Sequence, residues 1–384
     1  MSLYVNRLTL TAFRSWEAVR IEADSRPIVL TGPNGAGKTN ILEAVSLLSP
    51  GRGLRRAPLA NLQRLGSPPH LSWGVAATVC NAHGTVDIGT GRDPEATGPA
   101  ERRLVRINGQ PVHNQNALAD HLAMAWLTPA MDRLFQEGAS ERRRFLDRLV
   151  FSFDPAHAGR ISRYDKALRE RSRLLRDSVR PDPVWLKALE DEMATTGTAM
   201  AAARLDMVQN LDSVCSTYKG PFPALSVNLS GTPEDWLATM PALEAEQRLR
   251  EALAAARGGG EGDGTTPGPH RSDMRVRHVD RDMPAELCST GEQKILLVAL
   301  VLAHARLLKA SRSRAPVLLM DEVVAHLDAH RRSALFEAIL SLGVQVWMTG
   351  TDAGVFDEIR SQSLLLDVGG EKVVTSTAGS ELVA

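Results

Sequence analysis

The sequence predicts an α/β fold that is interrupted by a large, mainly helical insertion. Three observations support this prediction. A glycine-rich stretch, Gly32 to Thr39, follows the apolar run Ile28-Val29-Leu30 and precedes a segment with apolar residues at helical spacing. A second apolar run, Val317 to Met320, ends in two adjacent acids. Between the two runs, residues 141–257 are dominated by charged, Ala- and Leu-rich stretches of helical character.

The elements before the insertion are predicted from their periodicity and turn residues. Residues 3–13 and 28–31 are expected to be strands, and the segment from Ile41 to Leu48 a helix. Residues 104–112 contain Asn108-Gly109, a pair that suits a two-residue turn. A β-hairpin is therefore expected there.

The insertion is expected to form a compact arm. Helical stretches run from Ser140 to Met207 with breaks at Pro155 and at Pro181-Asp182-Pro183, and residues 236–256 are again helical. Sustained heptads are missing, which excludes a long coiled coil. Residues 225–229 are expected to be a strand that returns toward the main sheet.

The last part of the chain predicts a return to the α/β fold. Six glycines between Gly258 and Gly268 indicate a mobile loop. An apolar helical run from Ile295 to Ala303, the apolar strand, a helix over 331–340 and a strand over 344–348 follow. We therefore divide the chain into residues 1–140, 141–257 and 258–384.

The glycine-rich stretch matches the P-loop of nucleotide-binding proteins at every defined position. Its glycines allow backbone N–H groups to surround phosphates, Lys38 reaches the β- and γ-phosphates, and the Thr39 hydroxyl ligates Mg²⁺. The expected ATP-binding residues of this loop are Gly32, Pro33, Asn34, Gly35, Ala36, Gly37, Lys38 and Thr39. A chance match in a glycine-rich loop is the alternative.

The two acids after the second apolar run fit the Walker B pattern, and they follow Lys38 by 283 residues. Asp321 is expected to hold the Mg²⁺ shell, and Glu322 to orient and deprotonate the attacking water, so Glu322 and Lys38 are the candidate catalytic residues. A buried strand that ends in exposed acids is the alternative.

The segment Ser289 to Lys294 has the form of an ABC signature motif. The Ser289 hydroxyl, the Gly291 N–H and the positive end of the following helix together suit a γ-phosphate. Because one chain of this superfamily cannot present its signature to its own P-loop, the motif implies an ATP-dependent homodimer. A capping box formed by Ser289 and Glu292 is compatible with that role and could equally stand alone. Downstream, Asp328 occupies a D-loop position at the expected dimer seam.

The composition restricts the remaining possibilities. The chain has 384 residues, enough for two or three domains, with 45 basic and 45 acidic residues. Nucleic-acid binding must therefore come from local patches. Three scattered cysteines argue against a disulfide framework or a metal site and fit a reducing cytoplasm. The start of the chain is unlike a signal peptide, and no apolar run is long enough to span a membrane, so we expect a soluble protein with no membrane partner.

The order of P-loop, insertion, signature and Walker B indicates a P-loop NTPase of the ABC-ATPase head type with an inserted helical arm. The sequence closely resembles the bacterial RecF family. The resemblance is carried by Phe13-Arg14-Ser15-Trp16, Lys38 to Ala44, Leu48 to Gly53, Glu141 to Asp147, Gly268 to Asp273, Ser289 to Lys294 and Asp321 to Asp328. The blocks Glu141 to Asp147 and Gly268 to Asp273 are the most specific.

The resemblance implies the function and extends the site. It implies a weak ATPase that dimerises on ATP, binds DNA at gaps and single-strand/double-strand junctions, and assists recombinase loading with mediator partners. It adds Arg14, Asn40 and Gln293 to the expected ATP site. Two departures stand out: the glutamine expected near Leu127-Thr128-Pro129 is missing, and Thr349 occupies the region where a histidine is expected. Thr349 could contact the γ-phosphate or cap its strand.

DNA contact is expected from local positive charge. Residues 141–180 hold twelve basic and six acidic residues, and such a face suits phosphates without base readout. The low aromatic content, 4%, favours duplex contact over stacked single strands. The candidate DNA-binding residues are Arg52, Arg55, Arg56, Arg142, Arg143, Arg160, Arg163, Lys166 and Arg271. A solvated, ion-paired helix is the alternative for the arm, and a structural role in pinning its loop is the alternative for Arg271.

Three functional classes compete at this point. The motifs favour a DNA-repair ATPase dimer. An ATPase subunit of another machine, SMC-like or associated with a transporter, shares the head, although a transporter subunit carries a shorter insertion. A nuclease would need two metals, and the sequence offers no carboxylate and histidine cluster for them outside the ATP site.

Overall fold

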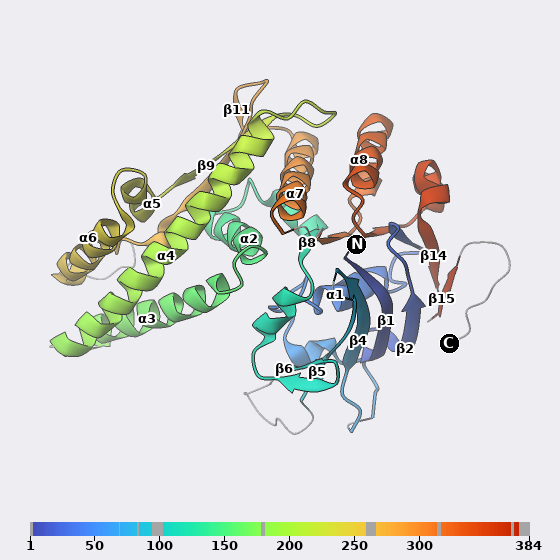
Figure 1. Ribbon diagram of the computed structural model, residues 1–384, viewed down its shortest axis with the longest axis horizontal. Coiled ribbons are helices and arrows are strands. Elements are labelled where there is room, and N and C mark those ends of the chain that lie inside the picture. Colours follow the sequence, from blue (N-terminus) through green and yellow to red (C-terminus); the bar gives the residue numbers. More distant parts are fainter. Residues whose placement is uncertain are drawn as a thin grey trace. The chain divides into compact units, whose positions relative to one another are not determined.

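The computed structural model describes residues 3–68, 70–82, 84–93, 103–177, 181–258, 266–312, 316–369 and 372–375. These residues form two compact units, one from residues 1–131 and 301–384 and one from residues 132–300 (Figure 1). The first unit carries the P-loop and the Walker B acids, and the second carries the helical arm and the signature. Most of the expected glycine loop, residues 259–265, lies outside the described residues.

The first unit contains two six-stranded sheets. One is antiparallel, with the order β2-β1-β4-β5-β6-β7. Its strands are β1 (Tyr4–Phe13), β2 (Trp16–Glu22), β4 (Gly74–Asn81), β5 (Gly84–Arg92), β6 (Arg103–Ile107) and β7 (Gln110–Val112). Buried and exposed positions alternate along β4, as expected for a sheet with one face on the core. The predicted hairpin is confirmed, with left-handed φ angles of 50° at Asn108 and 78° at Gly109.

The second sheet is parallel except at one edge, with the order β15-β14-β3-β13-β12-β8. Its strands are β3 (Ile28–Thr31), β8 (Met124–Leu127), β12 (Val317–Met320), β13 (Val346–Gly350), β14 (Leu364–Gly369) and β15 (Lys372–Thr375). Every residue of β3, β12 and β13 is buried. This explains why these strands appear in the sequence as unbroken apolar runs.

Helix α1 (Lys38–Ser46) packs against both sheets of the first unit. It contacts β1 of the antiparallel sheet and β13 of the parallel sheet, and a single hydrophobic cluster joins residues of the two sheets and the helix. Helix α8 (Ala329–Leu342) is capped by Asp328 and ends at Gly343, which has a left-handed φ of 57°. Helix α7 (Thr290–Arg312) begins in the second unit and ends in the first.

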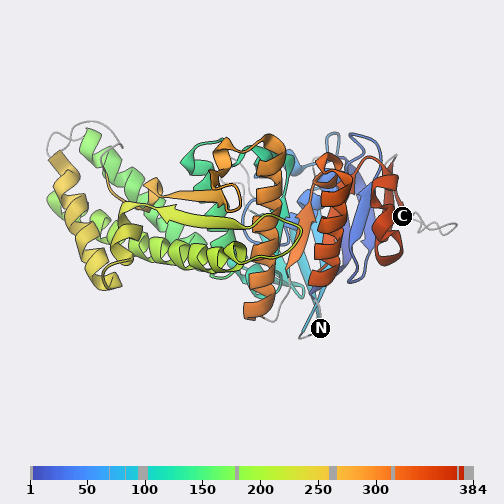
Figure 2. The same ribbon diagram turned by 90° about the horizontal axis from the view of Figure 1, so that it is seen from above.

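The second unit consists of helices around a small sheet. The helices are α2 (Ala139–Phe151), α3 (His157–Asp177), α4 (Pro183–Ser216), α5 (Thr232–Leu237) and α6 (Ala242–Ala255), and the strands are β9 (Leu225–Ser230), β10 (Asp273–His278) and β11 (Met283–Pro284). The 34-residue α4 extends over about 50 Å at 1.5 Å per residue. It contacts α3, α6 and β9, and Figure 2 shows β9 running beside it. The arm is thus a helical unit that packs on itself.

Two expectations for the arm need correction. The strand at residues 225–229 does not return to the main sheet, because β9 pairs with β10 in a separate sheet of the order β11-β10-β9. The helical stretch over 236–256 is divided into α5 and α6 at Pro241, the N-cap of α6. Proline has no N–H to continue the first helix.

Gly197 allows close packing at the centre of the arm. A Cβ atom at this position would lie 3.0 Å from Tyr164 and 3.3 Å from both Leu249 and Pro269. α3, α6 and the turn Pro269–Arg271 therefore meet α4 where it has no side chain.

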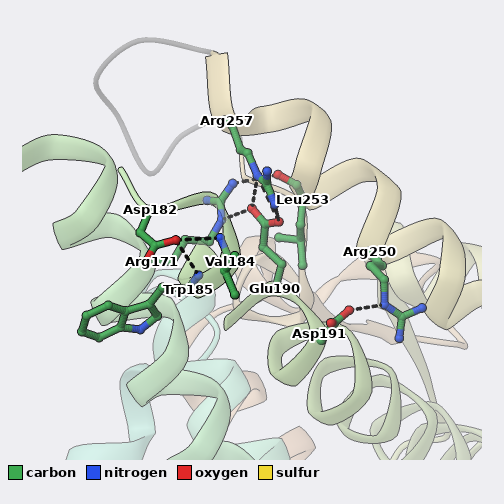
Figure 3. Close-up of polar contacts among 9 residues, drawn as sticks. All are labelled: Arg171, Asp182, Val184, Trp185, Glu190, Asp191, Arg250, Leu253 and Arg257. Atoms are coloured by element: carbon green, nitrogen blue, oxygen red, sulfur yellow. Dashed lines mark hydrogen bonds and ion pairs between the residues drawn. The ribbon is translucent and has the colours of Figure 1, made fainter. Parts of the chain in front are cut away.

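The tip of the arm is held by a buried carboxylate between two arginines (Figure 3). Glu190 of α4 accepts hydrogen bonds from Arg171 of α3 at 3.0 Å and from Arg257 at 3.0 Å. Arg171 also donates to the Leu253 carbonyl of α6 at 2.7 Å. The cluster ties the ends of three helices together and leaves Trp185, in the first turn of α4, about half exposed.

Candidate nucleotide-binding site

The glycines of the P-loop adopt conformations that other residues would not tolerate. The loop connects β3 to α1, with φ angles of 143° at Gly32, 82° at Gly35 and 95° at Gly37. A Cβ atom on Gly32 would lie 2.1 Å from the Val368 carbonyl oxygen, and one on Gly37 would lie 2.7 Å from the Ser15 hydroxyl. The intervening Pro33, Asn34 and Ala36 lie at the exposed to half-buried turn of the loop. Glycine is thus required for both backbone conformation and space.

Lys38 is a buried cation held by carbonyl oxygens. Its ammonium group donates to the carbonyls of Gly32 at 2.6 Å and Pro33 at 2.8 Å. Burial lowers the pKa of Lys38, while the charges of Glu322 and Asp321 act in the opposite direction. Among the described residues, no carboxylate lies within ion-pair distance of this ammonium. The charge is therefore available for an anionic ligand at the loop.

The parallel sheet brings the Walker B acid to the P-loop. Asp321 follows β12 and is 5% exposed, and its Oδ1 accepts a hydrogen bond from the Thr39 hydroxyl at 2.9 Å. The two residues meet because both follow carboxyl ends of parallel strands in one sheet. A carboxylate beside a hydroxyl provides the hard oxygen ligands that Mg²⁺ prefers, so this pair fits the expected metal site.

Glu322 has an unusual backbone conformation for a residue with a side chain. Its φ angle is 52°, in the left-handed region, and its N–H donates to the Thr349 hydroxyl at 2.8 Å. Such conformations concentrate at functional sites. The Glu322 side chain is half-buried, as the proposed water-activating base requires.

Thr349 takes the place of the expected histidine and binds the Walker B acids. It is 1% exposed at the end of β13, and its hydroxyl donates to Asp321 Oδ1 at 2.9 Å. The sequence is compatible with either a γ-phosphate contact or a strand cap at Thr349. In the structure its hydroxyl bonds to the side chain of Asp321 and to the backbone N–H of Glu322. The only sequence signal for this arrangement is a threonine in the region where a histidine is expected.

Arg14 and Asn40 each make polar contacts with other side chains of the first unit. Arg14 donates to both carboxylate oxygens of the buried Glu43, at 2.8 and 2.9 Å, and to the Asn61 carbonyl at 2.8 Å. Asn40 donates to the Ser15 hydroxyl at 2.9 Å. Their expected nucleotide contacts stay predictions, and the described contacts show how both side chains are oriented.

The basic cluster after α1 has an anchor that the sequence did not reveal. Arg52, Arg55 and Arg56 are exposed, and Arg55 donates to the Asn40 amide oxygen at 3.1 Å. Arg103 of β6 anchors the segment: it donates to the Gly51 carbonyl at 2.6 Å and to the Leu47 carbonyl, and it also donates to the Thr90 hydroxyl of β5 at 2.8 Å. Burial lowers the pKa of Arg103 to about 10.

The signature is exposed and is organised as a capping box. The backbone N–H and hydroxyl of Ser289 donate to the Glu292 carboxylate at 2.9 and 2.8 Å, and Glu292 N–H donates back to Ser289 Oγ at 3.4 Å. The backbone N–H of Ser289 lowers the pKa of Glu292. Ser289 and Gly291 are exposed, whereas Gln293 is buried and donates to the Cys288 carbonyl at 2.8 Å. The capping box is thus present, and it leaves Ser289 and Gly291 open to solvent.

The D-loop residue Asp328 also has a helix-capping role. Its carboxylate accepts from the Arg331 N–H at 2.9 Å at the start of α8. Its side chain is 57% exposed, so a partner could still reach it.

Most of the candidate DNA-binding arginines in the arm are already paired. Arg142 binds the Asp273 carboxylate at 2.7 and 3.0 Å, and Arg143 donates to the Ser272 carbonyl at 2.8 Å. Arg160 pairs with Asp154, and Arg163 with Glu192 at 3.1 Å. These contacts give the four arginines structural roles within the arm.

Lys166 differs from these arginines, because it belongs to an exposed basic row on α3. Lys166, Arg169 and Arg173 are spaced three and four residues apart and are all exposed, and no ion pair of theirs occurs among the described residues. They lie on the face opposite the buried Tyr164 and Arg171 of the same helix. We call Lys166, Arg169 and Arg173 the α3 basic row.

The specific block from Gly268 to Asp273 is pinned at the base of the arm. Tyr164 lies 2.7 Å from His270 Nδ1, and Arg204 donates to the Pro269 carbonyl at 2.5 Å. Arg204 also binds both oxygens of Asp147, at 2.7 and 2.9 Å. Arg271 remains exposed. His270 thus has a partner within the arm, Tyr164. Of the two neighbouring residues His270 and Arg271, only Arg271 has an exposed side chain.

Comparison with known proteins identifies the family. Residues 4–369 match the family described as "RecF/RecN/SMC N terminal domain". The "DNA replication and repair protein RecF" of Rhizobium meliloti (strain 1021) is 48% identical over 374 residues, covering 97% of this chain and 98% of the relative. Its counterpart in Rhizobium rhizogenes (strain K84 / ATCC BAA-868) is 49% identical over 373 residues, covering 96% and 98%.

Solved structures share the fold. The structure of the recombination mediator protein RecF-ATPrS in the RecFOR pathway superimposes with a TM-score of 0.83 at 20% identity, covering 98% of this chain and 99% of the other. An Smc head domain from Pyrococcus furiosus gives a TM-score of 0.56 at 17% identity, covering 98% and 96%. None of the helices in the described residues is both long and apolar enough to cross a membrane. The fold is that of an ABC- and SMC-type ATPase head, and the chain belongs to the RecF family.

Proposed function

We propose that this chain is an ATP-dependent DNA-binding protein of recombinational DNA repair and replication-fork maintenance. In this proposal an ATP-driven homodimer acts as a clamp at gapped or junction DNA, assists recombinase loading and SOS induction together with mediator proteins, and uses slow, DNA-stimulated ATP hydrolysis as a switch. The family membership supports the pathway. In this proposal the protein acts in the cytoplasm.

The observation that carries the proposal is the contact between Thr39 and Asp321 beside the unneutralised Lys38. A phosphate chain at the loop would meet the Lys38 ammonium and the backbone N–H groups at the start of α1. Thr39 and Asp321 would hold Mg²⁺, which neutralises charge on the β- and γ-phosphates. Glu322 would then deprotonate the attacking water.

The exposed signature supports the dimer. Ser289 and Gly291 lie at the open N-terminus of the 23-residue α7, where a partner's γ-phosphate would find the Ser289 hydroxyl and the N–H groups of Thr290 and Gly291, for which no hydrogen bond occurs among the described residues. The capping box stabilises that helix start without covering it.

The α3 basic row supports duplex contact. The three exposed cations lie within eight residues of helix, so about 10 Å separates the first from the last at 1.5 Å per residue, and they can contact phosphates without reading bases. The cations of Arg142, Arg143, Arg160 and Arg163 are engaged within the arm, and we assign them a supporting part. Arg52, Arg55, Arg56 and Arg271 complete the proposed set.

Sedimentation of the purified protein, with and without ATP and with and without gapped duplex DNA, tests the proposal. We expect a dimer only with ATP, and DNA in the dimer peak. Ser289→Arg should bind ATP through its intact P-loop but remain monomeric, because a bulky cation occupies the place of the partner's phosphate. The matched control is Ser216→Arg, at an exposed position at the end of α4.

Two outcomes contradict the proposal. A Ser289→Arg protein that dimerises on ATP and retains DNA as well as the wild type would leave Ser289 only as a helix cap. An ATP-driven dimer that binds no gapped or duplex DNA at low salt would favour the alternative, an ABC-type ATPase subunit of another, SMC-like or transporter-associated machine.

A further inference from the structure

Thr349 lies between the P-loop strand and the Walker B strand. In the parallel sheet, β13 is hydrogen-bonded to β3 on one side and to β12 on the other. Thr349 pairs in register with Leu30, and the preceding Met348 pairs with Met320, the residue before Asp321. Thr349 and Asp321, the residues that follow this pair, therefore lie at the same level of the sheet.

The Thr349 hydroxyl uses both of its hydrogen-bonding functions within the site. It donates its one hydrogen to Asp321 Oδ1 at 2.9 Å and accepts the Glu322 N–H at 2.8 Å. The same Asp321 oxygen accepts the Thr39 hydroxyl at 2.9 Å. A continuous chain of hydrogen bonds thus connects Thr39, Asp321, Thr349 and the backbone of Glu322.

This chain of hydrogen bonds acts at a residue with a left-handed backbone conformation. Glu322 has a φ of 52°, which side-chain-bearing residues adopt only when their surroundings enforce it. The bond from its N–H to Thr349 is an enforcing contact, because Thr349 is 1% exposed and fixed in the middle of a sheet. The direction of the Glu322 side chain depends on this backbone conformation.

We propose that Thr349 is a positioning residue for ATP hydrolysis, which fixes the backbone of Glu322 and the carboxylate of Asp321 together. The inference rests on the proposed ATPase function and assigns it a further residue. Thr349 acts through the two acids and makes no contact with ATP of its own. Its loss should therefore reduce turnover and leave ATP affinity nearly unchanged.

Thr349→Val tests this assignment, because valine keeps the shape of threonine and replaces the hydroxyl with a methyl group. We expect kcat for ATP to fall about tenfold to a hundredfold, since small displacements of a catalytic group have effects of this size. The KM for ATP and the Kd for a slowly hydrolysed ATP analogue should change by less than about threefold, as for an interaction used only in the transition state. Thr349→Ser, which restores the hydroxyl, should recover most of the turnover.

A double variant separates positioning from a general loss of stability. In a Glu322→Gln background the base is already absent, so adding Thr349→Val should produce little further loss of turnover. Thr196→Val is the matched control, because it removes a buried hydroxyl that bonds to the Glu192 carbonyl of its own helix at 2.5 Å. Its kcat should equal that of the wild type.

Clear results would overturn the inference. Wild-type kcat in Thr349→Val, a loss of ATP affinity as large as the loss of turnover, or no rescue by serine each contradicts it. Should Thr349→Val fail to fold, Thr349→Ala replaces it, because alanine removes the hydroxyl without placing a methyl group against Asp321. Failure of the wild type to hydrolyse ATP would overturn the proposed function and this inference together, whereas normal wild-type turnover with an unaffected Thr349→Val would overturn the inference alone.

Discussion

The nucleotide site and the base of the arm hold their buried cations in opposite ways. Among the described residues, the Lys38 ammonium has only carbonyl oxygens within hydrogen-bond distance, whereas Arg204 is bound through two hydrogen bonds by Asp147. A buried charge is costly unless it is paired. Arg204 is therefore already satisfied in the folded arm, and Lys38 is satisfied fully only when an anion arrives.

The same distinction separates the arginines of the arm from the α3 basic row. Arg142 is bound by Asp273 and is only 16% exposed, while Lys166 and Arg173 are exposed and lie on the outer face of their helix. A basic residue count for residues 141–180 combines both kinds. Only the contacts show which cations are committed to the fold.

Removal of the Lys38 charge should have the largest effect. Lys38→Met leaves no other side chain in the loop to contact the β- and γ-phosphates. We expect ATP affinity to fall at least about a hundredfold, the scale of a lost hydrogen bond to a charged group in a buried site, and dimerisation and turnover to disappear. Equilibrium titration with ATP measures this, and affinity within a few-fold of the wild type would show that the loop is not the site.

Removal of the Glu322 base should affect chemistry alone. Glu322→Gln preserves shape and should lower turnover by about a hundredfold to ten-thousandfold, the usual contribution of general base catalysis. ATP affinity should be unchanged, and dimers should accumulate on ATP in sedimentation. Wild-type turnover would exclude Glu322 as the base.

At the base of the arm, the corresponding change should affect stability instead of ATP binding. Asp147→Asn leaves Arg204 buried without its carboxylate and should destabilise the protein by about 3 kcal/mol, measured by urea unfolding. The control is Asp191→Asn, because its pair with Arg250 is partly exposed and should be worth about 1 kcal/mol or less. Equal losses in the two variants would show that burial of the pair is unimportant.

The contribution of the Asp147–Arg204 ion pair to stability should also depend on pH. Burial alone would raise the pKa of Asp147, but the charge of Arg204 and the hydrogen bonds from His157 and Arg204 outweigh burial and hold this pKa below its ordinary value near 3.8. A carboxyl group whose pKa is lowered in the folded state stabilises the folded protein at pH values above its ordinary pKa. This stabilisation is lost as the pH falls through the folded-state pKa. The wild type should therefore lose stability below about pH 4 more steeply than Asp147→Asn.

Neutralising the α3 basic row should have the smallest effect. The triple variant Lys166→Gln, Arg169→Gln, Arg173→Gln should bind duplex DNA about tenfold more weakly at low salt and reduce the slope of log K against log salt by up to about 2.7. The control triple Arg20→Gln, Arg26→Gln, Arg360→Gln removes the same charge from exposed arginines that already pair with acids. Equal effects of the two triples would indicate that net charge matters and the α3 basic row does not.

The sequence by itself determined the elements whose signals are local. The P-loop, the buried parallel strands, the hairpin at Asn108-Gly109 and the helices of the arm each follow from residue type and spacing within a few positions. The specific blocks also pointed to the family, which the relatives confirm. In each case the physical cause, a backbone angle or a buried face, is present in one continuous segment.

Only the tertiary structure decided which distant groups share a hydrogen bond. Thr349 was one polar residue at a strand end until the strand order placed it between β3 and β12. The partner of β9, the anchor at Arg103 and the pairing of Arg142 were likewise undetermined, because each depends on residues dozens to more than a hundred positions away. Local sequence sets the conformation of a segment, but the neighbours of a side chain depend on how the whole chain packs.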